Sequence, residues 1–145
     1  IKRLIWHSNQ FANRKSQKQH QRKNLHHRKL KPMPKILLAE DDNTMVSLLK
    51  TLLKMEGFEV VALDVNADVP AAVQKENPDS LLMDVHLGKQ SGMDIVKAIR
   101  EIPALANVRI VMTSGLNVKE ECLQRGANYF LMKPFMPDDL LKLLK

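Results

Sequence analysis

The sequence of 145 residues has little cysteine, few aromatic residues and no long apolar run. Its single cysteine, Cys122, cannot form a disulfide within the chain or a cysteine metal cluster, and it fits a reducing compartment. No apolar stretch approaches the roughly 18 residues needed to cross a bilayer. Polar residues follow the apolar residues 4–6 too soon for a signal peptide. We therefore expect a cytoplasmic protein with no membrane span.

Acidic residues are absent from the first 35 positions, which hold 11 of the 23 Lys and Arg residues and four of the five His. From residue 36 onward, 12 basic residues face 16 acidic ones, a formal charge of −4, although the whole chain carries +7. The first segment lacks the apolar surface that would offset its ordering entropy. We predict a basic tail or linker over residues 1–34, flexible or partly helical, and a single domain over residues 35–145 with a short last helix.

The charge of this tail is also that of an arm that binds nucleic acid or an acidic surface, with Trp6 and Phe11 among its bases. Blocks of like charge are commonly disordered, so we favour a linker or an extension over this binding role. Three histidines, His20, His26 and His27, have neither acidic or Cys companions nor regular ligand spacing. They predict no metal site in the tail.

Beyond Pro34, short apolar runs alternate with amphipathic stretches. The apolar runs are typical of buried strands and span residues 35–39, 58–63, 80–83, 108–113 and 129–132. Apolar residues at helical spacing predict five helices. The first begins at a cap at Asn43 and ends before Gly57, and the others span 69–76, 93 to Pro103, about 118–125 and Pro137 onward. A loop is predicted over residues 85–92. This alternation indicates a doubly wound α/β fold, a five-stranded parallel sheet of order 2-1-3-4-5 with helices on both faces.

Polar residues stand where four of these strands end. They are Glu40, Asp41 and Asp42 after the first strand, Asp84 after the third, Ser114 after the fourth and Lys133 after the fifth. In a doubly wound sheet the carboxyl ends of the strands line the ligand crevice, so we expect these side chains to converge. Any one of them has an ordinary structural explanation, but the set together is difficult to assign to chance.

Converging carboxylates repel one another and raise one another's pKa unless a cation lies among them. Ligands that are all oxygen atoms favour a hard divalent ion, here Mg²⁺. Attack by an aspartate on phosphorus is an established form of covalent catalysis, and an ammonium and a hydroxyl would stabilise the developing charge. The strand ends therefore predict a phosphoryl-acceptor site.

Four motifs carry a resemblance to a known family. They are Ile-Leu-Leu-Ala-Glu-Asp-Asp over 36–42, Leu-Leu-Met-Asp-Val-His-Leu over 81–87 with Gly92 after it, Ile-Val-Met-Thr-Ser-Gly over 110–115, and Gly-Ala-Asn-Tyr-Phe-Leu-Met-Lys-Pro-Phe over 126–135. Through these motifs, the chain from Lys35 to Lys145 resembles the receiver domain of two-component response regulators. The resemblance implies a flavodoxin-like receiver fold.

It also implies a function. A sensor histidine kinase or a histidine phosphotransfer protein would donate a phosphoryl group to the domain with the help of Mg²⁺, and a partner-binding face would then switch. The protein would be a signalling switch rather than an enzyme, limited to self-catalysed phosphoryl transfer and slow autodephosphorylation. Its output would pass through a downstream protein partner or an upstream effector domain.

The resemblance assigns roles by position. It implies Asp84 as phosphoacceptor, Glu40, Asp41 and the Val85 carbonyl as further metal ligands, Lys133 and Ser114 as catalytic groups, Ser114 and Phe130 as switch residues, and a cis peptide at Lys133–Pro134. Thr113 competes with Ser114; we favour Ser114 because the side chain of Thr113 should point to the opposite face of the strand. Asp42 is either a third acid or a helix cap, and we favour the cap or an electrostatic role. His86 is expected beside the site, where it would tune the access of water.

The chain departs from the family pattern in the loop after Asp84, where Gly88 stands in place of a common proline and predicts a looser loop. Three other classes of protein fit less well. A phosphatase of the haloacid dehalogenase type would need an aspartate at position 86, which is histidine. A flavodoxin-like cofactor binder would need a Gly- and hydroxyl-rich loop after the first strand, and a P-loop nucleotide triphosphatase would need a Gly-x-x-x-x-Gly-Lys motif; neither occurs.

Overall fold

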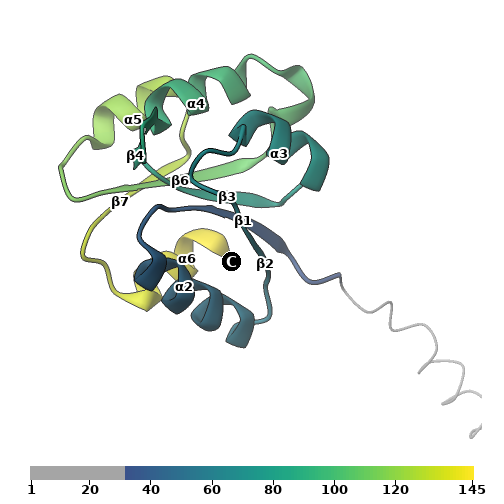
Figure 1. Cartoon of the computed structure of the whole chain (residues 1–145), viewed down its shortest axis with the longest axis vertical. Helices are drawn as coiled ribbons and strands as arrows, with labels where there is room; N and C mark the ends of the chain where they lie inside the picture. The colour runs from purple at the N-terminus through teal and green to yellow at the C-terminus, as the bar shows by residue number, and fades with distance from the viewer. Residues whose placement is uncertain (1–31) are drawn as a thin grey trace, which may run out of the picture. The chain divides into compact units, whose positions relative to one another are not determined.

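The computed structural model describes residues 32–145, and one compact unit spans Met33–Lys145 (Figure 1). Its middle layer is a parallel sheet with the strands β1 (Lys35–Ala39), β2 (Glu59–Ala62), β3 (Ser80–Asp84), β6 (Arg109–Ser114) and β7 (Tyr129–Met132). Their order is β2-β1-β3-β6-β7, with every neighbouring pair parallel. The predicted order 2-1-3-4-5 is confirmed.

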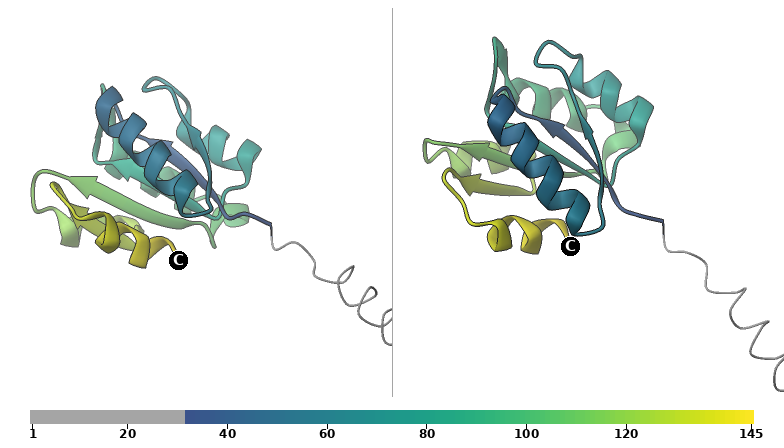
Figure 2. Two further views of the ribbon diagram at one scale, coloured as in Figure 1. Left: turned by 90° about the horizontal axis from the view of Figure 1, so that it is seen from below. Right: turned by 60° about the horizontal axis from the view of Figure 1, so that its bottom comes forward.

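Helices cover both faces of this sheet, as predicted (Figures 1 and 2). They are α2 (Asn43–Met55), α3 (Val69–Glu76), α4 (Gly92–Arg100), α5 (Lys119–Arg125) and α6 (Pro137–Leu144), with a 3₁₀ turn η1 (Pro103–Leu105) after α4. Within residues 32–145, no helix has the length and apolar character to cross a membrane. The predicted basic tail falls almost entirely on residues 1–31, outside the described part of the chain.

The alternation of side chains along the strands builds two hydrophobic cores. In β1, Leu37 and Ala39 join a first core cluster beneath α3, α4 and α5, whereas Ile36 and Leu38 join a second core cluster beneath α2 and α6. All five residues of β3 are buried, as expected for the central strand of a sheet covered on both faces. This rigid sheet fixes the positions of the residues at its strand ends.

Three local predictions were wrong. Asp42, not Asn43, caps α2, and its side chain accepts a hydrogen bond from the Met45 N–H, which confirms the cap favoured for Asp42 itself. The predicted loop over residues 85–92 contains a short antiparallel hairpin, β4 (His86–Leu87) and β5 (Gln90–Ser91). The helix expected to continue to Pro103 ends at Arg100, because the chain leaves the helix at its C-cap Glu101 and Pro103 begins η1.

Candidate functional site

Three carboxylates meet at the carboxyl end of the sheet. Glu40 and Asp41 directly follow β1, and Asp84 is the last residue of β3. Because Ala39 and Met83 lie opposite each other in the β1–β3 pair, the next residues, Glu40 and Asp84, emerge side by side. One carboxylate oxygen from each of the three acids lies within 4.8 Å of the others. Of the four acids expected to converge, these three do, whereas the side chain of Asp42 caps α2.

Lys133 completes the cluster from the segment after β7. Its Nζ atom lies 2.8 Å from Oε2 of Glu40 and 2.7 Å from Oδ2 of Asp84. The Lys133–Pro134 peptide bond is cis, as the resemblance implied. Burial lowers the pKa of Lys133, but hydrogen bonds to Asp84 and Glu40 outweigh burial and hold that pKa above its ordinary value. The cluster therefore contains a stable cation.

Glu40 is the most deeply buried of the three acids, with 5% of its surface exposed. Burial raises its pKa, against the opposing effects of the Lys133 ammonium and of the Asp42 N–H, which donates to Oε1 at 3.2 Å. The nearby charge of Asp84 raises the pKa of Glu40 further. A carboxylate in this environment gains from any additional cation beside it.

The β4–β5 hairpin contributes backbone donors to two of the acids. The His86 N–H donates to Oδ1 of Asp84 at 3.0 Å, and the Gly88 N–H donates to Oδ2 of Asp41 at 3.2 Å. Each oxygen of Asp84 therefore has its own partner, since Lys133 binds Oδ2. The His86 side chain itself is exposed at the edge of the site.

The two candidate hydroxyls lie at the end of β6, and both residues are buried. Thr113 lies opposite Asp84 in the β3–β6 pair. Residues opposite each other in a parallel pair point to the same face of the sheet, as Leu82 and Val111 show, since both belong to the second core cluster. Alternation separates the two hydroxyls, as predicted, but Thr113 is the one on the face of Asp84. Ser114 ends the strand; its Oγ accepts from the Leu116 N–H at 3.1 Å and its carbonyl accepts from the Lys133 N–H.

The Val85 carbonyl lies at the base of the hairpin, where it accepts a hydrogen bond from the Gly92 N–H at 2.7 Å. A Cβ atom on Gly92 would lie 2.5 Å from the carbonyl oxygen of Asp84 and 2.9 Å from that of Val85, so only glycine fits this position. Gly92 thereby holds the backbone of the phosphoacceptor candidate close to α4.

Phe130, the candidate switch aromatic, is partly buried and packs against the first core cluster. It lies opposite Met112 in the β6–β7 pair. In the same strand, Tyr129 and Met132 are 42% and 50% exposed. β7 therefore has side chains both in the core and on the surface of the domain.

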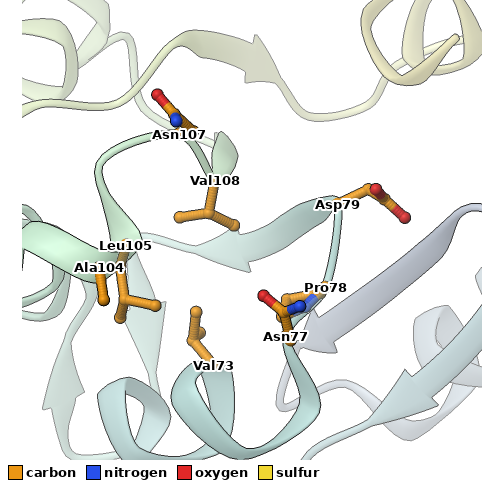
Figure 3. Close-up of a pocket in the computed structure, with 8 residues that line it drawn as sticks. All are labelled: Val73, Asn77, Pro78, Asp79, Ala104, Leu105, Asn107 and Val108. Atoms are coloured by element: carbon orange, nitrogen blue, oxygen red, sulfur yellow. The ribbon is translucent and has the colours of Figure 1, made fainter.

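A separate hollow lies at the amino ends of β3 and β6 (Figure 3). It has a volume of about 230 Å³, and Val73, Asn77, Pro78, Asp79, Ala104, Leu105, Asn107 and Val108 line it. Its one carboxylate, that of Asp79, accepts the Lys35 backbone N–H at 2.7 Å. The lining combines apolar and amide groups without a cluster of ionisable groups, so the carboxyl end of the sheet remains the candidate site.

A family model for the response regulator receiver domain matches residues 36–145. The chain belongs to this family. It is 34% identical over 109 residues to the transcriptional regulatory protein CpxR of Escherichia coli K12. This alignment covers 75% of this chain and 47% of CpxR. It is also 34% identical over 112 residues to the chemotaxis protein CheY of Bacillus subtilis, over 74% of this chain and 92% of CheY. The chain thus spans about half the length of CpxR but most of the length of CheY.

Solved receiver structures share the fold. The Vibrio cholerae chemotaxis response regulator CheY4 superposes with a TM-score of 0.70 and 30% identity over 77% of this chain and 96% of its own. The receiver domain of a sensor histidine kinase from Pseudomonas aeruginosa PAO1 superposes with a TM-score of 0.68 and 28% identity over 77% of this chain and 93% of its own. That domain has a magnesium ion coordinated in its active site cleft. The predicted family and fold are confirmed.

Proposed function

We propose that Asp84 of this receiver domain accepts a phosphoryl group from a phosphohistidine of a sensor histidine kinase or a histidine phosphotransfer protein. The observation that supports this role most directly is the ion pair of Asp84 with Lys133 beside Glu40 and Asp41. A carboxylate nucleophile, further acids for a metal and a cation for the transferred group lie together at the carboxyl end of one sheet.

The donor set fits magnesium. Glu40, Asp41 and Asp84 offer only oxygen ligands, and the raised pKa of the buried Glu40 shows an unfavourable environment that a divalent ion would relieve. These three side chains would hold the ion. The Val85 carbonyl remains the proposed backbone ligand through its second lone pair, since Gly92 uses only one. When bound, Mg²⁺ supplies positive charge for a phosphoryl oxygen.

In the transfer, an oxygen of Asp84 forms a bond to phosphorus while the nitrogen–phosphorus bond of the phosphohistidine breaks and its electron pair stays on the imidazole. The His86 N–H and the Lys133 ammonium orient the carboxylate before the reaction. Lys133 then neutralises charge on the phosphoryl group. Slow hydrolysis of the aspartyl phosphate would end the signal, and the His86 side chain would tune the access of water to it. The domain is a switch rather than an enzyme with turnover.

The phosphoryl group adds close to two negative charges at the end of β3. Thr113 shares the face of Asp84, but Ser114 remains the proposed switch because alternation places it on the face of Phe130, which lies opposite Met112. We expect the Ser114 hydroxyl, which accepts from the Leu116 N–H, to donate to a phosphoryl oxygen and Phe130 to turn further into the interior. The surface formed by α5, β7 and α6 would change shape and alter the binding of a downstream protein or an effector domain. Asp42 acts as a helix cap in this scheme, and a cytoplasmic location suits the proposed donors.

Acetyl phosphate with Mg²⁺ tests this function directly. The parent chain should gain about 80 Da, the mass of a phosphoryl group, and EDTA should prevent the gain. Asp84→Asn should gain nothing. Asp94→Asn removes an exposed carboxylate of α4 outside the cluster and should be labelled like the parent. Equal labelling of Asp84→Asn and the parent would remove Asp84 from its proposed role.

A further inference from the structure

The β4–β5 hairpin connects Asp84 to α4 and lies between two acids of the cluster. His86 pairs with Ser91 and Leu87 with Gln90 across it. Backbone N–H groups from its first half bind Asp84 and Asp41, which belong to different strand ends. One short segment thus sets the orientation of two of the three carboxylates.

Gly88 forms the turn of this hairpin in a left-handed conformation, with φ of 57°. Proline could adopt neither this φ nor the role of N–H donor to Asp41. The predicted looser loop is therefore wrong: the glycine permits a tight turn whose backbone binds a site residue. The turn also lies against the segment between β2 and α3, since a Cβ atom at Gly88 would lie 3.3 Å from Cγ2 of Val65.

Gln90 fastens the other half of the hairpin to the same segment. Its Nε2 atom donates to the carbonyl of Val65 at 2.8 Å and to that of Ala67 at 3.1 Å, so both amide protons are used. Leu87, opposite Gln90, is fully buried in the first core cluster. The side chains of Gln90 and Leu87, which share one face of the hairpin, therefore anchor both of its strands.

We propose that Gln90 is a positioning residue for the metal-dependent reaction of Asp84, a role that rests on the proposed function. Its amide holds the hairpin against the β2–α3 segment and so keeps the Gly88 N–H on Asp41. Asp41 is exposed, and the Gly88 N–H is the hydrogen bond that the structure gives its carboxylate. A carboxylate oriented in advance loses less freedom when it binds a metal, and groups that orient ligands typically change metal affinity by about 10- to 100-fold.

The test compares Gln90→Met with the parent chain. Methionine keeps the length of the side chain and its neutrality but has no N–H to donate. Gln74→Met makes the same substitution on the exposed face of α3 and is the matched control. Amide hydrogen exchange of Gly88 and the Mg²⁺ dissociation constant are measured by NMR without any phosphodonor, so both remain informative if Asp84 is not phosphorylated.

For Gln90→Met we expect faster exchange of the Gly88 amide and an increase of the Mg²⁺ dissociation constant of about tenfold. The labelling rate of Asp84 should recover at saturating Mg²⁺, and Gln74→Met should match the parent in every measurement. In an Asp41→Ala background, Gln90→Met should change the Mg²⁺ affinity by less than about twofold, because the side-chain oxygen that the Gly88 N–H orients is gone.

Two results would overturn the proposal. Unchanged exchange of the Gly88 amide in Gln90→Met would show that the amide of Gln90 does not hold the turn. Faster exchange with unchanged Mg²⁺ affinity, or an equal loss of affinity with and without the Asp41 carboxylate, would show that Gln90 stabilises the loop without positioning Asp41. Failure of the phosphoryl-transfer function would instead appear as an unlabelled parent chain that still binds Mg²⁺.

Discussion

The Nζ atom of Lys133 lies 2.7 Å from Oδ2 of Asp84 and pairs at the same time with Glu40. The two strands that carry this contact are not neighbours, since β6 lies between β3 and β7. The side chain of Lys133 therefore reaches across β6 to the centre of the site. This geometry places a full positive charge in direct contact with the proposed phosphoacceptor.

Replacing Lys133 with methionine should slow the labelling of Asp84 by acetyl phosphate by on the order of a hundredfold, because charge on the transferred group would lose its stabilising partner. The labelling rate is measured by mass spectrometry at saturating Mg²⁺. Lys97→Met, on the exposed side of α4, is the control and should leave the rate unchanged. A Lys133→Met chain labelled as fast as the parent would refute the assigned role.

Two substitutions of Asp42 distinguish its role as a helix cap from a role as a metal ligand. Asp42→Ala should lower the free energy of unfolding by about 1 kcal/mol, because the Met45 N–H loses its acceptor. Asp42→Asn keeps a capping oxygen and should retain both stability and Mg²⁺ affinity. Urea unfolding and a Mg²⁺ titration measure the two properties. A large loss of Mg²⁺ affinity in Asp42→Asn would instead assign Asp42 to the metal.

Gly92 should tolerate no side chain. Gly92→Ala forces apart the backbone of Asp84 and the start of α4, so we expect a loss of at least about 2 kcal/mol in stability and slower labelling of Asp84. Gly115→Ala is the matched control, since its Cβ atom would meet nothing within 4 Å. Equal stability of these two variants, measured by urea unfolding, would contradict the close packing at Gly92.

Arg100, the last residue of α4, joins that helix to two segments, residues 105–108 and residues 126–128. Its guanidinium donates to the carbonyls of Gly126, Leu105, Ala106 and Val108 and to the side-chain oxygen of Asn128. Arg100→Ala should cost about 3 kcal/mol in urea unfolding, because these acceptors lose a charged donor. Arg100→Lys should recover little of the loss, since an ammonium cannot reach so many acceptors at once.

Arg125 provides the comparison for that prediction. It lies on α5 in contact with the exposed Asp94 at 3.4 Å and with Glu121 at 3.7 Å. Exposed ion pairs of this kind contribute little, so Arg125→Ala should cost less than about 1 kcal/mol. A cost for Arg100→Ala no larger than that for Arg125→Ala would show that the Arg100 contacts do not stabilise the fold.

Cys122 should be an unreactive thiol in the folded protein. It is fully buried, and burial raises its pKa, with a further increase from Glu121, so little thiolate forms at neutral pH. A thiol reagent at pH 8 should modify it at least about tenfold more slowly than in the urea-unfolded chain. Equally fast modification in both states would show that α5 opens readily and exposes the thiol.

The sheet and the acidic cluster were predictable because strong signals specify them. Buried parallel strands read as continuous apolar runs, and β3 is buried at all five positions. The strand order then brings the ends of β1 and β3 together, so Glu40 and Asp84 follow from pattern and topology alone. Lys133 was predictable only in combination with these acids, since a single lysine after a strand is usually solvated.

The remaining features depend on contacts that have no sequence period. The two-residue strands of the hairpin are too short to show alternation, and the Gln90 amide binds the backbone of a segment more than 20 residues away. The choice between Asp42 and Asn43 as cap depends on one residue of register. Thr113 and Ser114 alternate as predicted, but the strand pattern could not show which of them shares the face of Asp84 until the register with β3 was known.

The strand order also places the proposed phosphoacceptor two strands inward from the margin of the sheet. Neighbouring strands lie about 4.8 Å apart, so roughly 10 Å separates β3 from β7. Within the sheet β7 pairs only with β6, and it exposes Tyr129 and Met132. Phosphorylation of Asp84 would therefore change the ion-pair partner of Lys133, which follows the edge strand β7, where another macromolecule could detect the change without entering the interior.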